Sequence, residues 1–394
     1  MGPVRWKFYT PGERPEEDAQ RAIVTGRIDA WWSAFAAKTE DLDRMFNGQS
    51  EWDLVTWMER NLQSIDRRLM WEFGPGGSGG HRLVITPEAD HHLRPLIDEI
   101  LGHAPALPGW SFFAHRRPES VEQMTLAMKS RTGNEPAFTG VGLAPGECNR
   151  IDLAFQFPRA FLDRNGELAR TQAFLAAESL LGEDLATDWV GVLEAVAEVP
   201  QPLPPGALRR AFIMLAAEQR SRIPAQPFLD RLDSLPWTEI DLRPKKQEDY
   251  LHRYDLGAAV TCAPDLWRNA HSTQLFWSGR FSRSSETFCY LKIDRGGPMR
   301  RSAVGRRIRL EDALNRALRP QRLGCVIGGG SGRRYNYIDL ALVDVPAAAE
   351  AIRSLLQLAG LKTRRAWLLF FDDILGAEWI GMRPDSAPPP LPRS

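Results

Sequence analysis

The phrase Asn-x-Ile-Asp-Leu-Ala occurs twice in this chain of 394 residues, at 149–154 and again at 336–341. Each copy continues into apolar residues and is followed by a helix-like segment and then by a strand-like segment. The two halves therefore share an order of elements as well as a few letters. This repetition predicts a duplicated α/β unit, which limits the folds that the chain can adopt.

The second half of the chain predicts a complete β-α-β-β-α-β unit, the order found in ferredoxin-like folds. The first half predicts a similar series with one added strand and helix at 110–132. The predicted fold class is α+β, with two related ferredoxin-like (βαββαβ) antiparallel-sheet units preceded by N-terminal helices. The elements expected in the second half are strands at 273–277 and 287–293, a helix at 310–318, strands at 323–327 and 335–343, a helix at 346–358 and a strand at 366–371.

Changes in composition predict the domain boundaries. Two amphipathic, Trp-containing stretches predict an N-terminal helical segment at 1–68, and the first α+β domain follows at 69–200. The run Pro-Gln-Pro-Leu-Pro-Pro at the end of that domain favours an extended, stiff linker. We therefore expect a proline-rich and helical connector at 201–250 and the second ferredoxin-like domain at 251–394.

A carboxylate lies at the same place in both copies of the repeated phrase, Asp152 in the first and Asp339 in the second. Neighbours in a strand alternate between its two faces, so each Asp points away from the flanking Ile and Leu. The fully apolar face should pack on helices, which leaves the Asp face as the predicted open side of each sheet. Three interpretations remain open: a hydrogen-bond acceptor for a nearby Arg or backbone group, a contact for a ligand or partner, and an acid-base catalyst.

The glycine-rich segment at 328–334 is the most suggestive chemical feature. Glycines let backbone amides converge on an anion, and two arginines can grip a phosphate or a carboxylate. The segment is expected to be a loop between two strands, and it lacks the Gly-Lys-Ser/Thr ending of a P-loop. A flexible hairpin loop without a ligand is the alternative. The candidate ligand-binding residues are Gly329, Gly330, Ser331, Gly332, Arg333, Arg334, Asp339 and Asp152.

The overall charge is balanced, with 50 Lys and Arg against 50 Asp and Glu. There is thus no global field to attract nucleic acid or an anionic membrane, and we expect neither as a partner. No stretch approaches the roughly 18 apolar residues that a spanning helix needs. We expect a cytoplasmic protein.

No motif predicts a catalytic residue, a metal ligand or a cofactor. The four cysteines are far apart, without a CxxC pair or a histidine at zinc-ligand spacing, and are expected to be reduced and buried. The adjacent His91 and His92 point in different directions on a helix, so they do not predict a metal site.

Three motifs resemble those of a bacterial family of unknown function. They are Glu-Phe-Gly at 72–74, Ile-Thr-Pro at 85–87 and Ala-Pro-Ala-Leu-Pro-Gly-Trp at 104–110. The resemblance covers 31–158, about a third of the chain. It implies a bacterial origin and the fold of that family, and it implies no reaction and no site residues.

Two classes of function are consistent with these patterns. The first is a non-enzymatic protein-binding or regulatory module, such as a toxin-neutralising protein, that presents a sheet surface to a protein partner. The alternative is an enzyme or sensor that binds a small anionic ligand at 328–334. The fold class does not decide between them, because ferredoxin-like units host many unrelated activities.

Overall fold

The computed structural model describes residues 4–76, 79–296 and 301–390. Its chain divides into two compact units. Unit 1 contains Met1–Arg116 and Ile374–Glu378, and unit 2 contains Arg117–Asp373 and Trp379–Ser394. Among the described residues, no helix combines the length and the hydropathy needed to cross a membrane.

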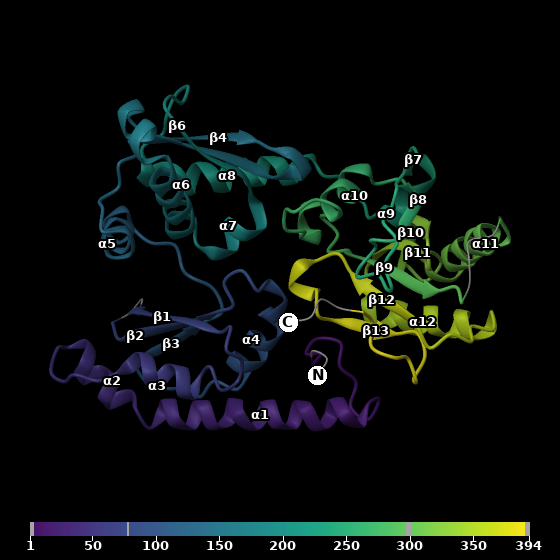
Figure 1. The fold of residues 1–394 in the computed structure, drawn as a ribbon, viewed down its shortest axis with the longest axis horizontal. Coiled ribbons are helices and arrows are strands. Elements are labelled where there is room, and N and C mark those ends of the chain that lie inside the picture. The colour runs from purple at the N-terminus through teal and green to yellow at the C-terminus, as the bar shows by residue number, and fades with distance from the viewer. Residues whose placement is uncertain (1–3, 77–78, 297–300, 391–394) are drawn as a thin grey trace. The chain divides into compact units, whose positions relative to one another are not determined.

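Unit 1 packs helices against a small sheet (Figure 1). Strands β1 and β2 form an antiparallel hairpin, and β3 returns parallel to β2 after α4. The core forms where Trp31, Trp32 and Phe35 of α1 meet Leu83 and Ile85 of β2. The elements are α1 (Pro15–Ala36), α2 (Thr39–Phe46), α3 (Leu54–Asn61), β1 (Met70–Pro75), β2 (His81–Thr86), α4 (Arg94–Gly102) and β3 (Trp110–Phe113).

The first part of unit 2 is a second three-stranded sheet with helical cover. Strands β4 and β5 are antiparallel, and β6 lies parallel to β5 after two helices. Small residues of α6 such as Ala173 and Ala177 let it pack closely on Phe155 of β5. The elements are α5 (Val121–Thr132), β4 (Gly140–Pro145), β5 (Ile151–Gln156), α6 (Arg159–Leu181), α7 (Glu183–Trp189), β6 (Val190–Val196) and α8 (Leu208–Arg222).

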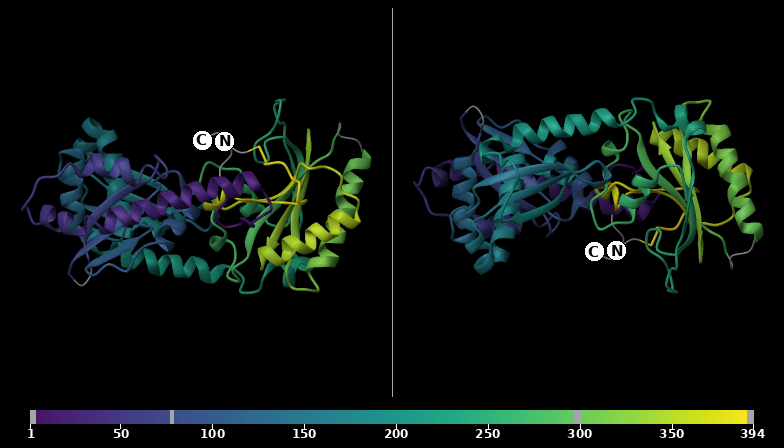
Figure 2. Two further views of the ribbon diagram at one scale, coloured as in Figure 1. Left: turned by 90° about the horizontal axis from the view of Figure 1, so that it is seen from below. Right: turned by 90° about the horizontal axis from the view of Figure 1, so that it is seen from above.

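The rest of unit 2 is built on a seven-stranded sheet in the order β13-β12-β9-β11-β10-β8-β7. Every neighbouring pair in this sheet is antiparallel. Helices α11 and α12 lie along one face of it (Figure 2). The elements are α9 (Phe228–Arg231), β7 (Thr238–Asp241), β8 (Leu256–Thr261), α10 (Pro264–Ala270), β9 (Thr287–Asp294), α11 (Arg301–Leu318), β10 (Gly324–Gly332), β11 (Tyr335–Leu342), α12 (Val345–Leu358), β12 (Ala366–Phe370) and β13 (Trp379–Gly381).

The mixed α+β class agrees with the prediction, whereas the predicted duplication is not confirmed. The segment at 69–200 was expected to form one βαββαβ sheet, but it forms two separate three-stranded sheets that belong to different units. Each has ββαβ connectivity with a parallel strand pair, which the seven-stranded sheet lacks. The segment at 273–277 is not a strand, and β7, β8 and β13 are strands that were not predicted.

The compact units also divide at a place that composition did not indicate, after Arg116. The segment at 201–250, predicted to be a proline-rich and helical connector, contributes to two hydrophobic cores. Leu208 and Phe212 of α8 belong to the core around β5, whereas Phe228 of α9 belongs to the core beneath the seven-stranded sheet. Both parts of this segment are therefore held by burial of apolar side chains.

Candidate functional site

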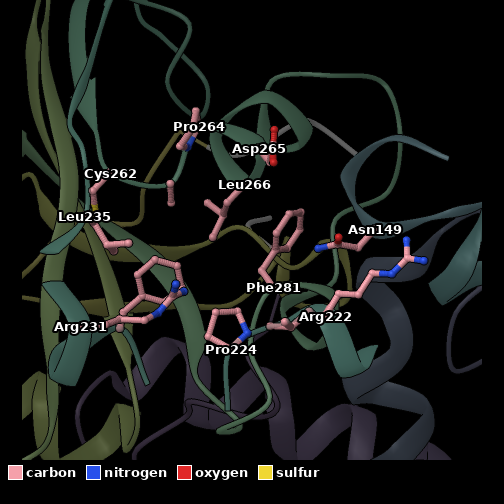
Figure 3. A pocket seen from close by; sticks show the side chains of 13 residues that line it. Asn149, Arg222, Pro224, Arg231, Leu235, Cys262, Pro264, Asp265, Leu266 and Phe281 are labelled. Atoms are coloured by element: carbon pink, nitrogen blue, oxygen red, sulfur yellow. The ribbon is translucent and has the colours of Figure 1, made fainter. Parts of the chain in front are cut away.

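A pocket of about 240 Å³ lies in unit 2 beside α9 and α10 (Figure 3). Its walls include Arg222 and Arg231 together with Cys262, Asp265 and Phe281. None of the residues predicted as ligand-binding lines it. The predicted site and the observed concavity are therefore two different places.

The glycine-rich segment predicted as a loop is the strand β10. All nine of its residues are buried, and it pairs with β11 on one side and with β8 on the other. Its backbone amides therefore take part in the hydrogen bonding of the sheet and do not converge on an anion. This applies to the four residues predicted to bind an anion there, Gly329, Gly330, Ser331 and Gly332. The loop prediction was wrong because glycine favours turns locally, whereas here the pairing on both sides decides the conformation.

Close neighbours explain why this strand is rich in glycine. A Cβ atom on Gly329 would lie 2.5 Å from Oε1 of Glu311 in α11, and one on Gly328 would lie 3.0 Å from Oδ2 of Asp339. The missing side chains thus make room for a carboxylate on each face of β10. Burial raises the pKa of Glu311 to about 7, although Arg307 donates a hydrogen bond to it at 2.6 Å.

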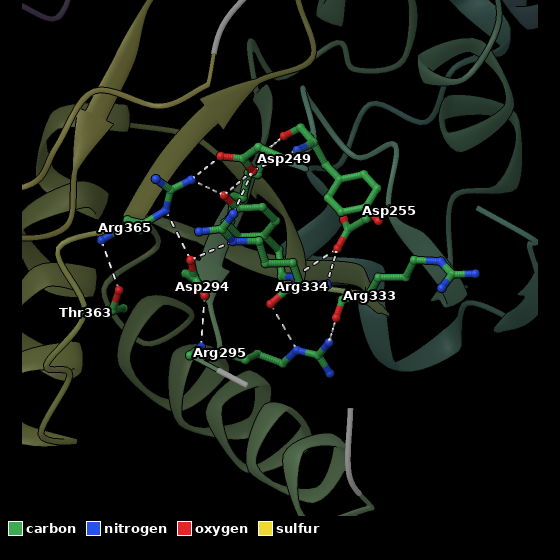
Figure 4. Close-up of polar contacts among 12 residues, drawn as sticks. Asp249, Asp255, Asp294, Arg295, Arg333, Arg334, Thr363 and Arg365 are labelled. Atoms are coloured by element: carbon green, nitrogen blue, oxygen red, sulfur yellow. Dashed lines mark hydrogen bonds and ion pairs between the residues drawn. The ribbon is translucent and has the colours of Figure 1, made fainter. Parts of the chain in front are cut away.

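The two arginines after β10 are engaged within the protein (Figure 4). Arg334 donates from Nε to Oδ2 of Asp294 at 3.0 Å, and its Nη1 lies 3.5 Å from Oδ1 of Asp249. Arg333 donates from Nε to the carbonyl oxygen of Pro244 at 3.0 Å. Their positive charge therefore holds the end of the sheet together, and Arg334 already has two carboxylates beside it.

A buried carboxylate, Asp255, closes the turn between β10 and β11. It accepts hydrogen bonds from the backbone amides of Arg334 at 2.7 Å and Tyr335 at 2.9 Å, and from the hydroxyl of Tyr337. On the other side, Arg295 donates to the carbonyl oxygens of the same turn. Backbone amides near the predicted anion site thus have a protein carboxylate as their partner.

Lys292 is a second buried charge in this network, and the sequence did not point to it. Its side chain is inaccessible to solvent, donates to the carbonyl oxygen of Tyr250 at 2.5 Å and lies 4.4 Å from the ring centroid of Tyr335. Burial lowers the pKa of Lys292 to about 8. A lysine of this kind can serve as a base, but here aromatic rings and backbone enclose it.

Asp339 lies in the middle of the seven-stranded sheet and is paired with Arg253. The distance from Nη2 of Arg253 to Oδ2 of Asp339 is 3.0 Å, and both side chains are buried. Burial raises the pKa of Asp339, against the effect of the guanidinium. The other oxygen, Oδ1, has no hydrogen-bond partner among the described residues. The face of β11 that was predicted to be open is therefore covered, and Asp339 has the structural role of an acceptor for an arginine.

Asp152 has a different environment. Its Oδ1 accepts a hydrogen bond from the backbone amide of Val192 at 2.7 Å, beside an irregularity in the pairing of β5 and β6. Gly191 leaves the room that this carboxylate occupies. Asp152 and Asp339 belong to different sheets and are not brought together, so the two carboxylates do not form one site.

The described residues contain no group of three or more His, Cys, Asp or Glu side chains placed to hold a metal ion. Burial raises the pKa of the Cys262 thiol to about 12 and raises the pKa of Cys289 and Cys325 as well. These thiols are therefore protonated near neutral pH, a state in which a cysteine is a poor nucleophile.

The seven-stranded sheet has a free edge at β7, which pairs with β8 and with no other strand of the described chain. The amide of Leu242 donates to the carbonyl oxygen of Gly257 at 2.9 Å, so the backbone groups of Leu242 point toward β8. Backbone groups alternate in direction along an antiparallel strand, and those of Glu239 and Asp241 therefore point away from β8. Both residues are exposed, and Trp237, just before β7, is 47% exposed.

No family model, curated protein or solved structure matches this chain. The resemblance to a bacterial family through the motifs at 72–110 therefore stays a prediction.

Proposed function

We propose that this chain is a non-enzymatic protein-binding module whose partner adds an extended segment to the free edge of β7. The observation that carries the proposal is the outward backbone of Glu239 and Asp241 at the end of a seven-stranded sheet. An edge strand presents unpaired N–H and C=O groups, and addition of a strand to such an edge is a common mode of peptide recognition.

The charge on this edge favours a basic partner segment over a second copy of the chain. Glu239 and Asp241 lie two residues apart, so their side chains share one face of β7. If two copies paired through β7, carboxylates would face carboxylates, which opposes association. A segment with Lys or Arg at alternate positions would instead place opposite charges side by side, and the exposed ring of Trp237 offers it an apolar contact.

The alternative function, binding of a small anion at 328–334, has less geometric support. The amides of β10 lie in a strand that is paired on both sides, and Arg334 has Asp294 and Asp249 beside it. We therefore favour a regulatory module of the bacterial cytoplasm that acts by occupying a basic segment of its partner. Neutralising a toxin is one form that such regulation takes.

We also propose that β9, α11, β10, β11, α12 and β12 form a ferredoxin-like unit that carries this edge. The β-α-β-β-α-β order and the spatial order β12-β9-β11-β10 support this assignment. Strands β8 and β7 extend the unit on one side, and β13 extends it on the other.

A peptide-display selection against the whole protein tests the proposal. We expect the enriched peptides to carry Lys or Arg at every second position and to bind in solution. Asp241→Pro removes one outward N–H donor without touching the hydrogen bonds to β8, so it should abolish binding. Asp241→Ala keeps the donor and loses only the charge, so binding should weaken without vanishing.

Two results would contradict the proposal. One is a selection that enriches no extended basic peptide. The other is a set of enriched peptides that bind Asp241→Pro as tightly as the unsubstituted protein, with circular dichroism showing that both are folded.

A further inference from the structure

We infer that the pocket beside α9 and α10 binds a small organic carboxylate with an apolar body. This inference goes beyond protein binding at β7, because it concerns a different surface of unit 2 and a different kind of ligand. It is based on an arginine whose buried Nε donor has no hydrogen-bond partner among the described residues, and on the walls around it.

Arg231 supplies the positive charge of the pocket (Figure 3). Its guanidinium carbon lies 4.1 Å from the ring centroid of Phe228, which holds the group against the pocket wall. The Nε atom is shielded from solvent and has no hydrogen-bond partner among the described residues. No ion pair of Arg231 with a described carboxylate is present. A buried donor without an acceptor is costly, so a ligand that accepts from it is stabilised.

The other charged groups at the pocket are already neutralised. Arg222 donates to Oε1 of Glu218 at 2.6 Å, and Asp265 lies 3.2 Å from Nη1 of Arg268. These pairs are exposed and contribute little to the field inside the pocket. Among the residues that line the pocket, Arg231 is therefore the charged group without an ion pair, which matches a monoanion. The nearby carboxyl of Glu286 lies outside the lining, and burial raises its pKa although Arg231 acts in the opposite direction.

The walls and the volume limit the ligand further. Phe228, Leu235, Leu266 and Phe281 give the pocket apolar walls. Its volume of about 240 Å³ lies below the roughly 300–1,000 Å³ of sites for drug-sized molecules, so the ligand is small. A planar guanidinium binds a carboxylate through two parallel hydrogen bonds, which makes an aromatic or short aliphatic carboxylate the best match.

Calorimetric titration of the full chain with benzoate tests the inference, with benzamide and inorganic phosphate as comparison probes. We expect saturable binding of benzoate and none of benzamide, which has the same shape without the charge. Arg231→Gln should weaken benzoate binding by at least about tenfold, because the charge-assisted hydrogen bonds are lost. Arg220→Gln, an exposed arginine of α8 outside the pocket lining, is the control and should change binding by less than about twofold.

Leu235→Trp gives an independent test that leaves Arg231 in place. The larger side chain should fill the pocket and block benzoate, even if Arg231→Gln fails to fold. The inference is overturned if benzoate does not bind saturably, if it binds Leu235→Trp or Arg231→Gln as tightly as the unsubstituted protein, or if phosphate binds as tightly as benzoate.

Discussion

Arg253 donates a hydrogen bond from Nη2 to Oδ2 of Asp339 at 3.0 Å, across 86 residues of sequence. The two side chains are 4% and 3% exposed. The guanidinium also lies among aromatic rings, with its carbon 5.2 Å from the ring centroid of Phe371 and 5.5 Å from that of Tyr290. This buried pair fastens the segment before β8 to the face of the sheet that carries Asp339.

Removing one member of this pair should destabilise unit 2 strongly. Arg253→Met leaves the Asp339 carboxylate buried without a counter-charge, which should lower the free energy of unfolding by about 3–5 kcal/mol. The double variant Arg253→Met with Asp339→Leu leaves no buried charge and should recover most of that loss. Urea denaturation measures both. A double variant as unstable as the single one would show that the charges themselves are not what the fold requires.

Gly330 should not tolerate a methyl group. A Cβ atom there would lie 2.5 Å from Cδ2 of Leu256 and 2.6 Å from the carbonyl oxygen of Ala258, so Gly330→Ala should lower the free energy of unfolding by about 1–3 kcal/mol. Gly26 in α1 is the control, because nothing lies within 4 Å of an added Cβ. Gly26→Ala should raise stability by about 0.5–1 kcal/mol. Equal effects at the two positions, measured by chemical denaturation, would contradict this account of the glycine strand.

Lys292 should make stability rise with pH above neutrality. Its pKa is about 8 in the folded chain and about 10.4 in the unfolded one, so the unfolded state binds more protons between these values. Lys292 therefore raises the free energy of unfolding by up to about 3 kcal/mol as the pH rises between these two pKa values. Below pH 8, the full cost of burying the charged side chain is present.

The matched comparison for this pH effect is Lys292→Met. Tyrosines and cysteines titrate in the same range in the unfolded state, but this contribution is common to both proteins and cancels in the difference. The stability of the unsubstituted protein relative to Lys292→Met should therefore increase from pH 8 to pH 10. A difference that stays constant with pH would show that Lys292 does not titrate abnormally.

Asp152 should act as a hydrogen-bond acceptor and not as a ligand contact. Asp152→Ala removes the acceptor of the Val192 amide, which lies at an exposed position, and should cost about 0.5–1.5 kcal/mol of stability. Asp152→Asn keeps an oxygen at the same place and should cost less than about 0.5 kcal/mol. Thermal denaturation distinguishes the two. An Asn variant as unstable as the Ala variant would indicate that the charge matters more than the acceptor.

The elements with strong local patterns could be predicted from the sequence. The alternation that predicted a strand at 335–343 agrees with β11, and the apolar period at 346–358 agrees with α12. The helix signals at Pro346 and Gly360 also lie at the ends of α12. Apolar periodicity identifies such a segment when at least one of its faces is buried, and in β11 both faces are buried.

The parts of the fold and of the site that could not be predicted depend on contacts between segments that are distant in the sequence. Glycine in β10 reads locally as a turn, and only pairing with β8 and β11 reveals that the residues are extended. The parallel pairing of β2 with β3 and of β5 with β6, which separates the first half into two sheets, has no counterpart in local spacing. Arg253 lies far from Asp339 in the sequence, and nothing near it indicated the pair. Nothing in the run from Phe228 to Arg231 pointed to a pocket, because the walls come from segments that are far apart in the sequence.

The assignment of Ile374–Glu378 to unit 1 has a consequence for how this protein can be shortened. Glu378 accepts hydrogen bonds from the amides of Trp6 at 2.6 Å and Phe8 at 2.9 Å, so the start of the chain is completed by a segment near its end. The polypeptide passes between the units after Arg116, after Asp373 and again after Glu378. A single cut at any of these places therefore cannot release a whole unit. A gene that stops before codon 374 would encode an N-terminal unit without Glu378, which accepts both of these hydrogen bonds.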